Sequence, residues 1–293
     1  MRREILIIVN PAAGRARSVE RRLGRFVAAL ERRGCRVVLR RAGASVGEVE
    51  RLARAAEPVF EAIVAAGGDG TVNAIMNGLA GRPLPVGVLP VGTANVLARE
   101  IGLPRDPKAL AAIIADGPAC AVWPGRIGGR AFVMMASAGF DSEIVAALDP
   151  ALKERAGRLA FVWAFLVRLW RYRACELIVR ADGIDHRAAG VIAAKGRHYA
   201  GPFVVAPHAS LTDPTFELVL LRRAGRWAIL RYAMALFFGR IARLRDVAIL
   251  RAGTATVIGE RSVPVQADGE IVGHLPATIA IAEHPLLLIR PVP

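Results

Sequence analysis

The chain has 293 residues, and because 54% of them are hydrophobic we expect a large core and no extended disorder. Its three cysteines, Cys35, Cys120 and Cys175, are widely spaced, which argues against a disulfide framework or structural zinc site and favours a reducing compartment. The net charge of +15 suits an anionic membrane, a phosphorylated substrate or nucleic acid. We expect no nucleic-acid partner, because the sequence has no zinc-finger spacing, RNP-like aromatic strand or basic tail.

The first part of the chain alternates strand and helix patterns. Strands are predicted at residues 5–9, 36–40, 60–66 and 86–89, and helices at residues 18–33, 46–56, 74–79 and 94–101. Ser18 is expected to cap the first helix, and Ser45 and Glu48 have capping-box spacing at the second. This alternation predicts a parallel sheet with helices on both faces, in an α/β domain over residues 1–122.

The second part, residues 123–293, is predicted to be a separate domain of antiparallel sheets. Short strand patterns separated by turn residues occur at 131–136, 176–180, 190–194, 203–206, 216–221, 254–258, 263–267 and 278–281. Two apolar helical segments, 159–170 and 227–239, are inserted among them and are interrupted by Arg168 and Arg231.

These two segments are shorter than the roughly 18 apolar residues that a membrane span needs. The simpler interpretation is a pair of helices buried in a core. The alternative is a pair of surface helices that touch lipid, with arginines reaching anionic headgroups.

Three glycine-containing turns follow predicted parallel strands. The most informative, Gly67–Asn73 (GGDGTVN), has glycines that let a phosphate approach the backbone, next to a helix start that favours negative charge. Asp69 would repel a phosphate, so it needs a cation, a substrate hydroxyl or a fixed set of donors. The turn after the first strand (NPAAG) and the turn with Thr93 and Asn95 end neighbouring strands, so all three are expected to converge on one ligand site.

Two turns of the second part also carry carboxylates. Asp213 lies in a proline-bearing turn, and Asp268 and Glu270 flank Gly269; each is most simply a turn former. Functionally, one carboxylate of the second pair could accept the proton of an attacking hydroxyl while the other holds the loop or a cation.

Taken in order, NPAAG, GGDGTVN, PVGTAN and a distal DGE resemble the bacterial diacylglycerol kinase-like lipid kinases, a family that includes sphingosine and ceramide kinases. The resemblance spans essentially the whole chain, although GGDGT alone is shared with NAD kinases. It implies a nucleotide-binding α/β domain of the NAD kinase and diacylglycerol kinase type, followed by a β-sandwich. ATP with Mg²⁺ would lie in the cleft between the domains, and the lipid hydroxyl would approach from the second.

The resemblance also implies roles for individual residues. Glu270 would be the general base with Asp268 in support, and Asp69 would organise the loop or a magnesium ion. A structural Mg²⁺ would be held by the Asp213 side chain and the Ser210 and Thr215 carbonyls. The ATP phosphates would be cradled by the first two turns, with help from the third: Asn10, Pro11, Ala12, Ala13, Gly14, Gly67, Gly68, Asp69, Gly70, Thr71, Val72, Asn73, Thr93 and Asn95.

Three positions depart from the family pattern: Ala74 and Val96 stand where relatives often have acidic residues, and Pro214 follows Asp213 where glycine is usual. Since proline removes an N–H group and fixes φ, the sequence leaves open whether this turn binds magnesium. Two alternatives to a lipid kinase stay open: a soluble NAD kinase-like enzyme that acts on a ribose hydroxyl, and a catalytically silent lipid-binding protein.

The expected location is the cytoplasm, with peripheral contact to the anionic inner face of the membrane. The sequence identifies neither the lipid nor the oligomeric state, and it is compatible with a homodimer.

Overall fold

The computed structural model describes residues 3–11, 16–43, 45–148 and 158–291. The chain forms two compact units, one made of Met1–Val122 with Glu283–Pro293 and the other of Trp123–Ala282. Each unit has its own sheets and its own hydrophobic core.

The first unit is built on a six-stranded sheet of order β2-β1-β3-β4-β20-β5. The first four of these strands are parallel, which confirms the predicted α/β architecture. The strands are β1 (Glu4–Val9), β2 (Arg36–Arg41), β3 (Ala62–Gly67), β4 (Val86–Pro90), β5 (Ala119–Val122) and β20 (Leu286–Ile289).

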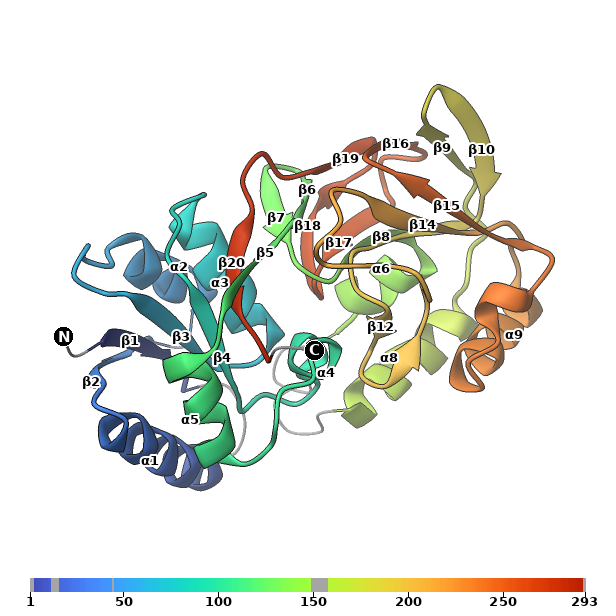
Figure 1. Cartoon of the computed structure of the whole chain (residues 1–293). Coiled ribbons are helices and arrows are strands. Elements are labelled where there is room, and N and C mark those ends of the chain that lie inside the picture. The colour runs from blue at the N-terminus through green and yellow to red at the C-terminus, as the bar shows by residue number, and fades with distance from the viewer. Residues whose placement is uncertain (1–2, 12–15, 44, 149–157, 292–293) are drawn as a thin grey trace. The chain divides into compact units, whose positions relative to one another are not determined.

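Helices cover both faces of this sheet, with α1 and α5 on one side and α2 and α3 on the other (Figure 1). Side chains of β1 and β3 that point to the first side pack with Phe26 and Leu30 of α1 and with Leu110 of α5. The helices are α1 (Ala16–Arg32), α2 (Val46–Arg54), α3 (Asp69–Leu79), α4 (Val96–Glu100) and α5 (Pro107–Asp116).

Several helix boundaries differ from those expected. Because α1 already begins at Ala16, Ser18 lies inside the helix and is not its cap. The short helix predicted at 74–79 starts instead at Asp69, so most of the glycine turn is the first part of α3. Gly78 does not end that helix; a Cβ there would lie 2.3 Å from the Glu50 carbonyl oxygen, so the glycine allows α2 and α3 to pack closely.

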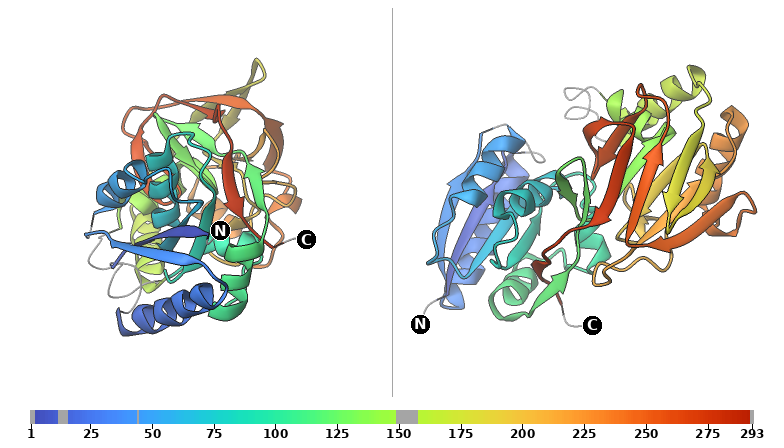
Figure 2. Two further views of the ribbon diagram at one scale, coloured as in Figure 1. Left: turned by 60° about the vertical axis from the view of Figure 1, so that its left-hand side comes forward. Right: turned by 90° about the horizontal axis from the view of Figure 1, so that it is seen from above.

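The C-terminal residues correct the predicted domain division, which placed all of 123–293 in the second domain. Residues 283–293 belong to the first unit, because β20 pairs in parallel with β4 and antiparallel with β5 (Figure 2). The chain therefore leaves the first sheet at Val122 and returns to it at its end.

The second unit contains two six-stranded antiparallel sheets, of order β10-β9-β16-β19-β6-β7 and β15-β14-β11-β8-β17-β18, and the small pair β12-β13. The first sheet contains β6 (Gly125–Ile127), β7 (Arg130–Phe132), β9 (Leu177–Ala181), β10 (Ile184–Ala188), β16 (Thr254–Ile258) and β19 (Ala277–Ile281). The second contains β8 (Met135–Gly139), β11 (Gly190–Ala194), β14 (Phe216–Leu221), β15 (Val247–Ala252), β17 (Pro264–Ala267) and β18 (Glu270–His274); the small pair is β12 (His198–Tyr199) and β13 (Phe203–Val204).

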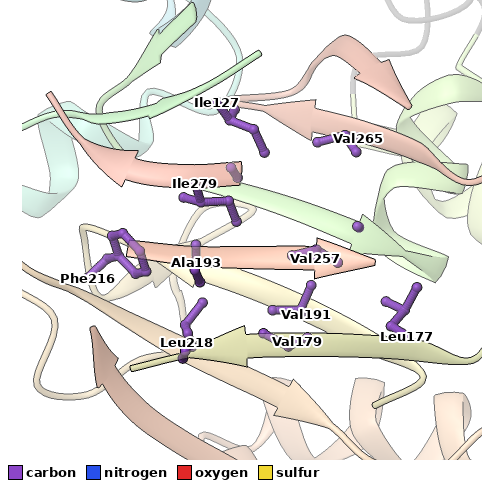
Figure 3. Packing of buried hydrophobic residues seen from close by; sticks show 14 of the residues in the cluster. Ile127, Leu177, Val179, Val191, Ala193, Phe216, Leu218, Val257, Val265 and Ile279 are labelled. Carbon is purple, nitrogen blue, oxygen red and sulfur yellow. The ribbon is translucent and has the colours of Figure 1, made fainter. Parts of the chain in front are cut away.

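Residues from both large sheets share one core, which confirms the predicted β-sandwich. Val179, Val257 and Ile279 of the first sheet pack with Val191 and Leu218 of the second (Figure 3). The single strand predicted at 131–136 is split into β7 and β8.

The helices formed by the described residues of the second unit are α6 (Phe140–Ala146), α8 (Arg158–Trp170), α9 (Arg226–Phe237) and the 3₁₀ turn η1 (Ile241–Arg243). Helices α8 and α9 are the two apolar segments, and the structure shows that their interpretation as buried core helices is wrong. Trp163, Trp170 and Trp227 are 62%, 77% and 84% exposed, and Phe237 is 63% exposed. None of the helices formed by the described residues is long and apolar enough to cross a membrane.

Candidate active site

Asn10 and Pro11, which begin the first turn, follow β1, and the other two glycine-containing turns follow β3 and β4, so all three start at the carboxyl ends of neighbouring strands. Asn10, just after β1, donates from its side chain to Thr71 Oγ1 (3.1 Å) and from its backbone to Ala66 O (3.1 Å). This ties the first turn to the second.

The second and third turns touch through glycines. A Cβ on Gly92 would lie 2.5 Å from the Gly68 Cα, so the two backbones approach more closely than any side chain allows. The amides of Val91 and Gly92 both donate to the Gly67 carbonyl, at 3.0 and 3.3 Å. The glycines are therefore needed where the turns meet.

Asp69 has fixed hydrogen-bond donors, which is one of the three kinds of partner expected from the sequence. Its two carboxylate oxygens accept hydrogen bonds from the backbone amides of Val96 (2.9 Å) and Leu97 (3.0 Å), at the start of α4. Asn95 adopts a left-handed conformation (φ 46°) and closes its own turn by bonding to both backbone groups of Gly92. Asp69 and Asn95 thus fix the loop between β4 and α4.

The start of α3 presents backbone donors to solvent. The amides of Thr71 and Val72 already donate to the Gly68 carbonyl, whereas the amides before them have no acceptor within the helix. Gly68, Asp69 and Gly70 are half-buried, but Val72 and Asn73 are only 1% and 4% exposed. The first residues of α3 are therefore partly accessible, whereas the side chains of Val72 and Asn73 are not.

Of the other residues proposed for nucleotide contact, the structure describes two and not the remaining three. Pro11 and Thr93 are exposed. Ala12, Ala13 and Gly14 lie outside the described residues.

In the second unit, Asp268 and Gly269 form the two-residue turn between β17 and β18, with positive φ values of 47° and 85°. Asp-Gly is one of the preferred sequences for such a turn. The Asp268 carboxylate accepts three backbone amides, from Val133 (2.7 Å), Met134 (2.9 Å) and Met135 (2.9 Å). These bonds interrupt the predicted strand at 131–136 and fix the hairpin in which half-buried Glu270 is the first residue of β18.

A polar network behind this hairpin was not expected. Gln266 accepts the Gly269 amide (2.8 Å) and donates to Ser137 Oγ (2.8 Å) and Asp141 Oδ2 (3.1 Å). Asp141 also accepts the hydroxyls of Ser137 and Tyr199. Burial and the neighbouring Asp141 raise the pKa of Tyr199 well above its ordinary value, so its hydroxyl stays protonated and donates.

The third predicted cluster, Ser210, Asp213 and Thr215, is gathered around a lysine. Lys195 follows β11 and is fully buried, and its ammonium donates to the carbonyls of Ser210 (3.1 Å), Thr215 (2.7 Å) and Asp213. The Asp213 carboxylate pairs with Arg251. Burial lowers the pKa of Lys195 to about 8, which leaves it charged at neutral pH.

The sequence carried weak signals for some of the unexpected groups. Gln266 precedes Gly269 by three residues, a spacing at which a side chain can accept the turn amide. Ser137, Asp141 and Tyr199 reach the network through the fold alone, from three separate elements or their ends.

Comparison with known proteins places both units in one family. Residues 4–126 match the model of the diacylglycerol kinase catalytic domain, and residues 134–290 match the YegS C-terminal NAD kinase beta sandwich-like domain. A diacylglycerol kinase of Mycobacterium tuberculosis is 31% identical over 98% of this chain and 95% of its own length. One of Bacillus subtilis is 30% identical over 92% and 90%.

Solved structures agree on the fold. The crystal structure of a diacylglycerol kinase from Bacillus anthracis str. Sterne covers 98% of this chain and 97% of its own, with a TM-score of 0.74 and 19% identity. Another crystal structure from that organism covers 98% and 95%, with a TM-score of 0.81 and 22% identity.

Proposed function

Because this chain belongs to the diacylglycerol kinase family and is a lipid kinase, we propose that it transfers the γ-phosphoryl group of ATP to a hydroxyl of a diacylglycerol-like lipid. The observation that carries this proposal is the meeting of Asn10, the Gly67–Asn73 turn and the Gly92 turn around the start of α3, with Asp69 held by the amides of α4. The names of the relatives favour diacylglycerol over a sphingoid base or ceramide.

The nucleotide phosphates are assigned to the half-buried first turn of α3. Backbone N–H groups there are unpaired within the helix, and a helix start favours negative charge. Gly68 and Gly92 keep side chains away from this backbone. Asp69 is a positioning residue in this scheme, since both of its oxygens are engaged with α4.

Glu270 is assigned as the general base. Its carboxylate takes the proton of the lipid hydroxyl as that oxygen bonds to the γ-phosphorus and the bond from the γ-phosphorus to the ADP oxygen breaks. General-base catalysis contributes about 10²–10⁴-fold. The support for this role is the rigid hairpin, which Asp268 and Gln266 hold from two sides.

Magnesium is proposed to arrive with the nucleotide. Kinase use of ATP implies a divalent metal, and no group of three or more His, Cys, Asp or Glu side chains among the described residues is arranged to hold one. A Mg²⁺ ion carried mainly by phosphate oxygens fits this donor set, because such ions commonly keep only one or two protein carboxylates. When bound it would neutralise charge on the phosphates.

The exposed faces of α8 and α9 are proposed to contact the surface of an anionic membrane. Arg226 joins the two helices: its guanidinium lies 5.8 Å from the Trp170 ring centroid and donates to the Trp170 carbonyl (2.6 Å). Exposed tryptophans beside exposed arginines are typical of an interfacial anchor.

This membrane contact can be measured by flotation with vesicles of phosphatidylcholine alone or mixed equally with phosphatidylglycerol. We expect the protein to float with the mixed vesicles and to be released by high salt. Trp227→Ser, at a side chain 84% exposed, should weaken binding by about 10-fold or more. Ile184→Ser, at a 61% exposed side chain of β10, is the matched control and should bind normally. Wild-type protein that stays unbound in low salt would contradict the proposed contact.

The kinase activity itself is tested with radiolabelled ATP and three acceptors: diacylglycerol, ceramide and NAD. We expect label in phosphatidic acid. Label in phosphorylated NAD would favour the soluble-kinase alternative. Vesicle binding without turnover of any acceptor would favour a silent lipid-binding protein.

A further inference from the structure

A lysine of this chain occupies the position that the family resemblance gives to a structural metal ion. The resemblance predicts a Mg²⁺ held by the carbonyls of Ser210 and Thr215 and by the side chain of Asp213. In the structure both carbonyls, and that of Asp213, accept hydrogen bonds from the ammonium of Lys195. We propose that Lys195 is the permanent cation of this turn, and that the turn therefore binds no divalent metal.

The Lys195 ammonium finds a hydrogen-bond acceptor in this turn for each of its hydrogens. It has three hydrogens, and three carbonyl oxygens receive them. A buried charge without such partners is strongly destabilising, and Lys195 is fully buried. A metal ion placed among the same oxygens would overlap the ammonium and be repelled by it.

The remaining expected ligand is also engaged. The Asp213 carboxylate pairs with Arg251, whose Nε donates to Thr215 Oγ1 at 2.7 Å. Two cations of the chain thus serve the turn, one at the carbonyls and one at the carboxylate. Pro214 follows Asp213 in the sequence and has no N–H group, so it cannot add a donor for the carbonyls. The residues present fit an internal ammonium and do not fit Mg²⁺.

The backbone of Lys195 is anchored as well. Its amide and that of Gly196 donate to the Met134 carbonyl, at 2.8 and 3.2 Å. The Met134 amide in turn donates to Asp268. The lysine therefore links the turn at 210–215 to the segment that holds the β17–β18 hairpin.

The proposal is tested by thermal unfolding of the full chain without nucleotide, in EDTA and in MgCl₂. The wild-type Tm should be the same in both. Lys195→Ala removes the ammonium and leaves space among the carbonyls, so its Tm should fall in EDTA. It should recover by about 3 °C or more in Mg²⁺ when the ion is in clear excess over its Kd.

Two variants control the comparison. Lys195→Met also removes the charge but fills the space, so its lowered Tm should not respond to Mg²⁺. Lys108→Ala, at an exposed position of α5, should leave the Tm unchanged in both buffers. A wild-type Tm that falls in EDTA, recovers in Mg²⁺ and loses this response in Asp213→Asn would overturn the proposal.

Crystals of the wild-type chain grown with MnCl₂ decide the matter even if the Lys195 variants do not fold. Side-chain density from Lys195 that reaches the three carbonyls supports the proposal. An anomalous manganese peak among these oxygens overturns it. Neither experiment needs kinase activity, so failure here is distinct from failure of the proposed function.

Discussion

Replacement of Asp268 by alanine should loosen the hairpin that carries Glu270. The substitution removes three hydrogen bonds to backbone amides, of 2.7, 2.9 and 2.9 Å. A hydrogen bond to a charged group contributes about 1.5–3 kcal/mol. The free-energy contributions of the three hydrogen bonds are not additive, because the bonds share one carboxylate. Water can also reach this half-buried carboxylate in the folded protein. We therefore expect a loss of about 3 kcal/mol, which lowers Tm by about 6–12 °C.

The chain offers a matched control in the β9–β10 hairpin. Asp182 and Gly183 form a turn of the same kind, with φ values of 50° and 78°, but Asp182 is exposed. Alanine at either aspartate carries the same strain of a left-handed conformation. The difference between Asp268→Ala and Asp182→Ala, measured by differential scanning calorimetry, therefore reports the loss of the Asp268 carboxylate contacts, which include the three amide bonds. Equal Tm values for the two variants would refute this account of the hairpin.

Two further predictions concern the nucleotide turns, and both are read from the Kd for ATP and from Tm. Asp69→Ala removes both hydrogen bonds to the start of α4, so we expect ATP affinity to fall by about 10-fold or more. Unchanged ATP affinity in this variant would show that Asp69 does not position the nucleotide site. Gly92→Ala places a Cβ 2.5 Å from the Gly68 Cα and should weaken ATP binding and lower Tm. Gly24→Ala in α1, where a Cβ meets nothing within 4 Å, should leave ATP binding intact, and a similar effect of both alanines would contradict the close-approach argument.

The strand-turn-helix units could be predicted from sequence because their signals are local. An apolar run, a glycine turn and a polar-apolar period specify each unit without reference to the rest of the chain. Helix α5 carried a local signal too, with Asp106 as N-cap and Pro107 in the first turn, and was still missed. By contrast, nothing near residues 286–289 indicates that they pair with β4, about two hundred residues earlier.

The hydrogen bonds of the site residues are made with partners that are distant in the sequence. Asp69 needed donors, and the sequence could not say that these are the amides of Val96 and Leu97. Lys195 was not singled out because nothing in its local sequence points to the turn at 210–215. Long-range hydrogen bonds of this kind are set by the fold, so single-sequence patterns do not contain them.

The apolar helices illustrate a different limit. Composition and period are alike for a helix that faces a core and for one that faces lipid. In α9, Tyr232 is 5% exposed while Trp227 is 84% exposed, so both environments occur on one helix. Only the packing of the second unit decides which side chains remain outside.

The proposed phosphoryl transfer depends most directly on the role of Glu270. The decisive measurement is the rate of phosphatidic acid formation from ATP and diacylglycerol by wild-type protein and by Glu270→Gln, with ATP affinity measured in parallel. Glutamine keeps the size of the side chain but cannot accept the proton as a carboxylate does. If Glu270 is the general base, kcat falls by about 10²–10⁴-fold in this variant while the Kd for ATP changes little. A Glu270→Gln variant with wild-type turnover would contradict this role.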